Sequence, residues 1–330
     1  VLALFGLARA AEICCPNIGC FSDTGVWNGM PLPECPSTQQ ITHELFTRSN
    51  RFNGQSVTRT NIPSVWNGNR ETVFLIHGWN NNKDTQWLHD AKNAILDRDD
   101  KNVIITGWGV GANRANYLLS ASNTRVVGAE TRQIKDVLRN AHGSNIQAYC
   151  AGHSLGGHTC GHVGQFGSDR GLNRISGLDP AGPAFAGADD RRGLNVNCAT
   201  LVEAWHTDGK DSINSYGTLK PMGHRDYYPN GGGVQPGCNS YMLGFQDAAA
   251  HPDLRDDPLI ACSHGRATKY FVQSAQNDCF RVRQICTNEE NMPGSCSSCS
   301  NCPNMGYVQG SGTNGKYYLE VNPSTPHCQN

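Results

Sequence analysis

The sequence has almost no net charge and lacks a long apolar run. Its 27 Lys and Arg residues nearly balance its 28 Asp and Glu residues, for a net charge of −1. Because no basic stripe stands out, we expect no nucleic-acid partner. A membrane-spanning helix needs about 20 consecutive apolar residues, so we expect no transmembrane segment. Internal repeats and usable N-glycosylation sequons are also missing, which leaves a globular chain large enough for one big core or two modest ones.

The N-terminus begins with a short apolar run, Val1–Ala8, followed by the small-x-small tripeptide Ala8-Arg9-Ala10. This pattern is typical of the end of a secretory signal peptide. We therefore predict that residues 1–10 are a signal remnant and that residues 11–330 form the folded domain. The 15 cysteines agree with export, because disulfide bonds persist in oxidising compartments. We expect a secreted, extracellular protein.

The odd number of cysteines means that at least one thiol is unpaired or bonded outside the chain. Cys150 is our candidate for a buried free thiol, because it lies in an apolar stretch that suits a strand. Cys296, Cys299 and Cys302 have a spacing that metal sites also use. In an exported chain we favour disulfide bonds for this cluster.

Short apolar strands alternate with helical patterns along much of the chain. We expect strands at residues 73–76, 103–105, 146–151, 175–178 and 201–205, and a helix at residues 124–141. This alternation predicts an α/β fold with a mostly parallel central sheet and helices on both faces. After Tyr270 the composition predicts a disulfide-tied, Cys-rich segment over residues 279–330, with a final strand at residues 316–321.

The pentapeptide Gly152-His153-Ser154-Leu155-Gly156 carries the clearest chemical signal. It fits G-x-S-x-G, the nucleophile elbow of α/β-hydrolases, in which a sharp turn between a strand and a helix exposes a serine. The motif alone is weak evidence, because about 0.3 matches arise by chance in a chain this rich in glycine. The apolar strand before it and the small residues after it favour the elbow over a glycine-rich surface loop.

An elbow serine needs a histidine as base and a carboxylate to orient that histidine, in the chain order serine, acid, histidine. Asp179 follows the next strand and would share a sheet edge with Ser154, although such an Asp also suits a turn cap. Four downstream histidines could serve, and the residues alone leave the choice open: His206, His224, His251 and His264. A zinc site at His158 and His162 would rest only on their i, i+4 spacing, which packed or surface histidines also have.

Eight segments in order resemble the pancreatic lipase family of animal secreted triacylglycerol lipases and related phospholipases A1, from Cys14 to about Val321. The segments are GCFSD (19–23), FLIHGW (74–79), VVGAE (126–130), GHSLG (152–156), GLDPA (177–181), HTDG (206–209), YPNGG (228–232) and CSHGR (262–266). The resemblance implies an α/β-hydrolase fold. It also implies ester hydrolysis through an acyl-enzyme.

The resemblance also implies roles for particular residues. They are Ser154 as nucleophile, Asp179 as acid, His264 as base, the N–H groups of Trp79 and Leu155 as oxyanion hole, and Tyr117 as an acyl-pocket aromatic that binds substrate. Four disulfide bonds are implied in the same way: Cys14–Cys20, Cys238–Cys262, Cys286–Cys296 and Cys299–Cys302. The resemblance assigns no partners to six other cysteines: Cys15, Cys35, Cys160, Cys198, Cys279 and Cys328.

Two departures from the family pattern change what we expect. The family holds a structural calcium on the loop after the catalytic acid, and here Asp190 keeps an oxygen ligand while Asn195 and Cys198 stand where two aspartates would be. A thiol is a poor calcium ligand, so we expect no required cofactor and no metal, only a remnant of the calcium loop. The chain also ends near where the family's C-terminal β-sandwich would begin. We therefore expect either a single-domain enzyme, with no such domain and no helper protein bound through it, or an incomplete chain.

Three functions fit the resemblance. The first is a triacylglycerol lipase acting at lipid–water interfaces, on an emulsion or membrane surface. The second is a phospholipase A1 or galactolipase, and the third is a catalytically silent lipid-binding protein, which has no need to keep a complete triad. Dedicated phospholipases of the family have a short lid and a short loop after the His-Thr strand. Loops longer than about 12–15 residues without obvious secondary structure are usually lids or binding loops, so we predict a lid over residues 238–262. It has 23 residues between its cysteines, and the loop Lys210–Met222 has 13, which favours triacylglycerol.

Overall fold

The computed structural model describes residues 11–165, 171–210, 215–238, 261–308 and 310–329. The predicted signal remnant lies outside the described residues, as does the interior of the predicted lid. The boundary at residue 10 therefore stays a prediction.

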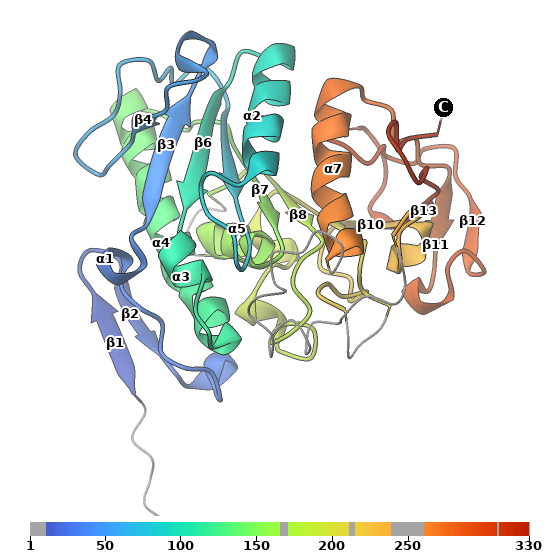
Figure 1. Ribbon diagram of the computed structural model, residues 1–330, viewed down its shortest axis with the longest axis horizontal. Helices are drawn as coiled ribbons and strands as arrows, with labels where there is room; N and C mark the ends of the chain where they lie inside the picture. Colours follow the sequence, from blue (N-terminus) through green and yellow to red (C-terminus); the bar gives the residue numbers. More distant parts are fainter. Residues whose placement is uncertain (1–10, 166–170, 211–214, 239–260, 309, 330) are drawn as a thin grey trace, which may run out of the picture.

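One large sheet organises the described part of the chain, where eleven strands lie in the order β12-β11-β13-β10-β9-β8-β7-β5-β6-β3-β4 (Figure 1). The strands from β13 to β6 run parallel. Their bounds are β5 (Thr72–Ile76), β6 (Asn102–Gly107), β7 (Ala148–His153), β8 (Arg174–Leu178), β9 (Leu201–Trp205), β10 (Arg225–Pro229) and β13 (Gly315–Leu319). The antiparallel edges are β3 (Thr42–Phe46), β4 (Gln55–Ser56), β11 (Gln284–Cys286) and β12 (Cys296–Ser298).

Helices cover both faces of this sheet. Phe74 and Ile76 of β5 pack in one core cluster with α4 (Tyr117–His142) and α5 (Leu155–Gln165). Val73 and Leu75, which alternate with them, pack in a second cluster with α2 (Gln86–Arg98) and α7 (Cys262–Gln276), which stand side by side in Figure 1. Successive strand residues point to opposite faces, so both faces are buried. The predicted α/β-hydrolase fold, with a mostly parallel sheet between two helix layers, is confirmed.

Three smaller elements complete the N-terminal half. The hairpin β1 (Glu12–Cys15) and β2 (Gly19–Ser22) forms a separate sheet, while α1 (Pro36–Gln39) and α3 (Gly109–Ala112) are single turns. The predicted helix at 124–141 extends to Tyr117 because the Asn116 side chain caps it by accepting a hydrogen bond from the Leu118 N–H at 3.0 Å. The predicted strand at 146–151 instead occupies 148–153, so it runs directly into Ser154.

All four expected disulfide bonds are present, and three more join Cys15 to Cys35, Cys150 to Cys160 and Cys279 to Cys328. The prediction that Cys150 is free is therefore wrong. After the turn at Ser154, α5 folds back on the sheet and brings Cys160 above Cys150, with 5.7 Å between their Cα atoms. Among the described residues the free cysteine is Cys198, which is buried.

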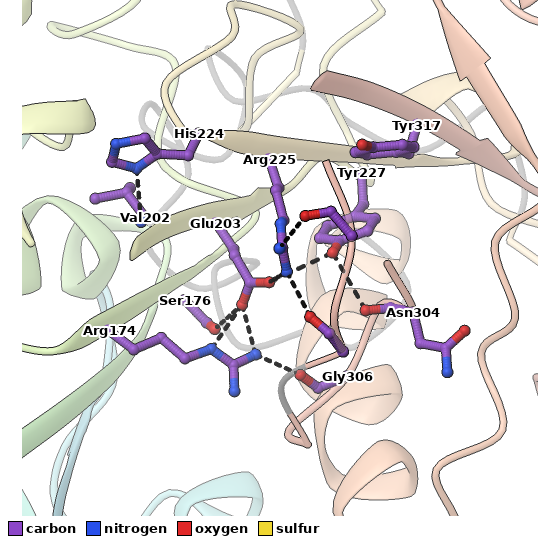
Figure 2. Close-up of polar contacts among 12 residues, drawn as sticks. Arg174, Ser176, Val202, Glu203, His224, Arg225, Tyr227, Asn304, Gly306 and Tyr317 are labelled. Atoms are coloured by element: carbon purple, nitrogen blue, oxygen red, sulfur yellow. Dashed lines mark hydrogen bonds and ion pairs between the residues drawn. The ribbon is translucent and has the colours of Figure 1, made fainter. Parts of the chain in front are cut away.

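A buried polar network ties the Cys-rich C-terminal segment to the sheet (Figure 2). The Glu203 carboxylate of β9 accepts a hydrogen bond from Arg174 at 2.7 Å and lies 3.8 Å from the Arg225 guanidinium. The same arginines donate to backbone carbonyls of the segment, Arg174 to Gly306 at 2.5 Å and Arg225 to Gly312 at 2.8 Å. Buried charges are tolerated when they are paired and hydrogen-bonded, so this segment belongs to the same core.

Candidate active site

Ser154 lies on a strained turn between β7 and α5. Its φ is +58°, in the left-handed region that residues other than glycine seldom adopt. A side chain on Gly152 would collide with the Gly156 carbonyl, and one on Gly156 would collide with the Ile76 carbonyl. The two glycines therefore let strand and helix approach closely enough to hold Ser154 in this conformation.

Asp179 follows β8 with a φ of +44° and is fully buried. One carboxylate oxygen, Oδ1, accepts hydrogen bonds from the backbone N–H groups of Thr207 at 2.7 Å and Asp208 at 3.1 Å. A side chain on Gly217 would collide with the carboxylate. These contacts fix the carboxylate and compensate its burial, because N–H donors stabilise a buried negative charge.

His264 lies in the first turn of α7, and its Nδ1 is 2.6 Å from Asp179 Oδ2. When Nδ1 carries the proton that it donates to Asp179, Nε2 of the neutral ring is an acceptor. His264 and Ser154 line one pocket of about 100 Å³, and Trp79, His153 and Tyr216 contribute to its walls. The chain thus brings together the serine, the carboxylate, one of the four candidate histidines and Trp79.

His77 fixes the peptide that precedes Trp79. Its Nδ1 donates to the Gly78 carbonyl at 2.9 Å, and its Nε2 accepts from the Trp108 N–H at 3.0 Å. Burial lowers the pKa of His77 to about 4, so the ring is neutral and can make both bonds. Because C=O and N–H point in opposite directions across a trans peptide, the Trp79 N–H points away from His77.

The other histidines have structural contacts. His206 is buried between Asp226 at 2.9 Å and the Thr218 carbonyl at 2.6 Å, and His224 accepts from the Val202 N–H at 3.0 Å. His251 lies outside the described residues.

Both ring nitrogens of His158 are engaged, by the Ala181 carbonyl and the Leu194 N–H, and burial lowers its pKa to about 4. His162 contacts Gln165 at 3.2 Å, so this pair packs the core rather than presenting zinc ligands.

Comparison with known proteins identifies the group to which the chain belongs. The family model described as Lipase matches residues 11–327. The chain belongs to the lipase family. Its relatives include pancreatic triacylglycerol lipase of Myocastor coypus, 33% identical over 321 residues, which are 92% of this chain and 69% of that protein. Inactive pancreatic lipase-related protein 1 of Homo sapiens is 32% identical over 324 residues, 93% of this chain and 68% of that protein.

A third relative, pancreatic lipase-related protein 2 of Homo sapiens, is 31% identical over 322 residues, which are 93% of this chain and 68% of that protein. Membership of the lipase family supports an ester hydrolase that acts on lipids. Some relatives are named inactive, so membership alone does not decide activity. No helix among the described residues combines the length and apolar character that crossing a bilayer requires.

Tyr117 and Leu155 are the other two residues to which the lipase resemblance gives roles. Tyr117, at the start of α4, packs edge-to-face on Trp79 with 5.1 Å between ring centroids, and its hydroxyl donates to the Pro183 carbonyl at 3.1 Å. Burial raises the pKa of Tyr117 well above its ordinary value, so the hydroxyl stays neutral. Leu155 is the first residue of α5. Helix N-termini favour negative charge, which suits the site for a developing oxyanion.

The loop that holds calcium elsewhere in the lipase family is closed here by amide groups. Asn195 Nδ2 donates to the carbonyls of Asp190 at 3.0 Å and Gly193 at 3.1 Å, and Gln165 Nε2 donates to Gly193 at 2.7 Å. Burial raises the pKa of the Cys198 thiol to about 11, so it is not a thiolate. Calcium takes carboxylate and carbonyl oxygens, and here the carbonyls already accept N–H donors. The residues present do not fit a calcium ion.

Sequence reasoning missed several neighbours of the triad. Thr207 and Asp208 supply N–H groups to Asp179, while Tyr216 and His153 lie against the His264 ring. Thr207 and Asp208 belong to the motif HTDG, and His153 belongs to GHSLG, which was the only sequence signal for these three residues. Tyr216 has no local sequence signal.

Proposed function

We propose that this protein is a secreted triacylglycerol lipase that acts at lipid–water interfaces through Ser154, His264 and Asp179. The observation that carries the proposal is the 2.6 Å contact between His264 Nδ1 and Asp179 Oδ2, beside a pocket that His264 shares with Ser154. A silent lipid-binding protein has no need of a serine on a strained turn next to a base so oriented. Export is supported by the seven disulfide bonds of the described chain.

The reaction begins when His264 Nε2 takes the proton of the Ser154 hydroxyl and Oγ attacks the ester carbonyl carbon. The N–H groups of Trp79 and Leu155 receive the negative charge that develops on the carbonyl oxygen. His264 then gives its proton to the leaving alcohol, which leaves an acyl group on Ser154. A water molecule, deprotonated by His264, attacks this acyl-enzyme, and the departing Ser154 takes the proton back. Asp179 stays ionised and holds the imidazole in the required tautomer. No step needs calcium or another cofactor.

Action at an interface is supported by the surroundings of the site. The disulfide bond between Cys238 and Cys262 joins the two ends of the predicted lid two residues from His264. Leu118, the neighbour of Tyr117, is 40% exposed, and Val234 is 52% exposed. Exposed apolar side chains such as these can rest on a lipid surface, since burying them there is favourable.

The test is a substrate panel on the purified protein: emulsified triacylglycerol, phosphatidylcholine and galactolipid, with products identified and Ser154→Ala as the matched control. We expect fatty acid and diacylglycerol from triacylglycerol, slower release from the two polar lipids, and no release by Ser154→Ala. Faster release from phosphatidylcholine or galactolipid would assign the second function, a phospholipase A1 or galactolipase. No release from any lipid would leave the silent lipid-binding protein.

A further inference from the structure

Two aromatic rings lie against the imidazole of His264. The Tyr216 ring stacks on it with 5.3 Å between centroids and 23° between the planes. The His153 ring is tilted against it at 4.4 Å, and its Nε2 donates to the His264 carbonyl at 3.0 Å. Burial holds the pKa of His153 well below its usual value, so this neighbour brings no positive charge.

The backbone of Tyr216 is held by the same short segment that holds the acid. The Tyr216 N–H donates to Asp208 Oδ2 at 3.0 Å, and the Gly217 N–H donates to the Asp208 carbonyl at 3.0 Å. The Tyr216 carbonyl accepts from the Gly182 N–H at 2.8 Å. Asp208 in turn donates its N–H to Asp179. The ring that covers His264 and the carboxylate that orients it are therefore fixed relative to each other.

We propose that Tyr216 is a positioning residue for His264, an inference that rests on the proposed function. Its ring face keeps the imidazole in the plane that points Nδ1 at Asp179, and this leaves Nε2 for Ser154, which lines the same pocket. When the proton moves from Ser154 Oγ to Nε2, the imidazole becomes a cation, and the electron-rich face of Tyr216 attracts it. Within the part of the chain that the structure describes, the carboxylates of Asp179 and Asp208 face His264, with oxygens within 4.8 Å of its ring nitrogen.

The experiment measures kcat and KM on a short-chain ester below its solubility limit, so that interfacial binding and the lid do not enter. Tyr216→Leu removes the ring, and Tyr216→Phe keeps it. Tyr318→Leu removes a half-buried tyrosine of β13 as the matched control. Cation–π contacts of about 1–2 kcal/mol correspond to about 5- to 30-fold in rate. We expect Tyr216→Leu to lower kcat by that factor with KM within about twofold, and Tyr216→Phe and Tyr318→Leu to stay near the wild type.

Each contrary result has a distinct meaning. A wild-type kcat for Tyr216→Leu overturns the proposal, and so does a loss confined to KM, which would make Tyr216 a substrate contact only. An equal loss in Tyr216→Phe would assign the effect to the hydroxyl and likewise overturn it. Melting temperatures check folding, and Tyr216→Met replaces the leucine variant should that variant not fold. Ser154→Ala is assayed alongside to distinguish failure of the proposed function from failure of the role proposed for Tyr216. Activity in Ser154→Ala would overturn the proposed function, whatever the Tyr216 variants show.

Discussion

Replacing Asn195 by Asp tests how the former calcium loop is held together. The Asn195 side chain is buried, and its Nδ2 makes two hydrogen bonds, to Asp190 and Gly193. An aspartate keeps the shape but turns a carboxylate oxygen toward these two carbonyls. Losing two hydrogen bonds of about 1 kcal/mol each, and leaving a partly desolvated charge unpaired, should cost about 2–4 kcal/mol. We expect a melting temperature several degrees lower in chelator.

Calcium should restore the lowered melting temperature only in a variant that has further carboxylates in this loop. In the double variant Asn195→Asp/Cys198→Asp, the loop offers two carboxylates and two carbonyls, a set of ligands that calcium prefers. Calcium at about 100 times its dissociation constant would add about 2.7 kcal/mol of stability. The assay is thermal unfolding in millimolar calcium and in chelator, with the exposed neighbour Asn197→Asp as the control for charge alone.

The wild type should melt at the same temperature in calcium and in chelator. A fall of several degrees for the wild type in chelator would refute this reasoning, because the loop would then bind calcium through other oxygens. A single Asn195→Asp variant as stable in chelator as Asn197→Asp would show that the two amide hydrogen bonds contribute little.

Three further predictions concern the triad, a buried histidine and the predicted lid. Asp179→Asn should lower kcat by about 10⁴ with little change in melting temperature, since an amide there favours the wrong tautomer of His264; a loss below tenfold would remove Asp179 from the triad. The pKa of His158 is about 4 in the folded protein and about 6.5 in the unfolded chain, so this residue should contribute up to about 3 kcal/mol to the free energy of unfolding above pH 6.5 and lose that contribution as the pH falls toward 4. His158→Gln should flatten the rise in unfolding free energy across this pH range. An unchanged slope would contradict the lowered pKa of His158. Activity on a short-chain ester should rise sharply when the ester concentration passes its solubility limit. Deleting Tyr241–Leu259 should abolish this rise and increase phospholipid hydrolysis relative to triacylglycerol hydrolysis. A smooth saturation curve through the solubility limit in the intact enzyme would contradict the lid hypothesis.

The parts of the site that could be predicted from the sequence are those with a local physical cause. Ser154 was recognisable because its turn needs Gly152 and Gly156, and Asp179 because it ends the next strand on the same sheet edge. His264 could not be chosen from the residues alone, because four histidines lie downstream and only tertiary structure brings one to Asp179. The family resemblance supplied that choice.

The failures also have physical reasons. The prediction of a free Cys150 fails because its pairing depends on how α5 packs on β7, which brings Cys160 above it. The helices α2 and α7 were not predicted. Tyr216 and the N–H groups that hold Asp179 come from a loop whose position is set by long-range hydrogen bonds. Neither the periodicity nor a motif in the sequence of that loop predicts these contacts.

Covalent labelling of the nucleophile tests the central claim most directly. The purified protein is treated with an active-site-directed phosphonate ester, and the modified peptide is identified by mass spectrometry. The account predicts one equivalent of label on Ser154, loss of lipid hydrolysis in step with labelling, and neither label nor hydrolysis in Ser154→Ala. Label on another residue, or hydrolysis that survives in Ser154→Ala, would contradict it.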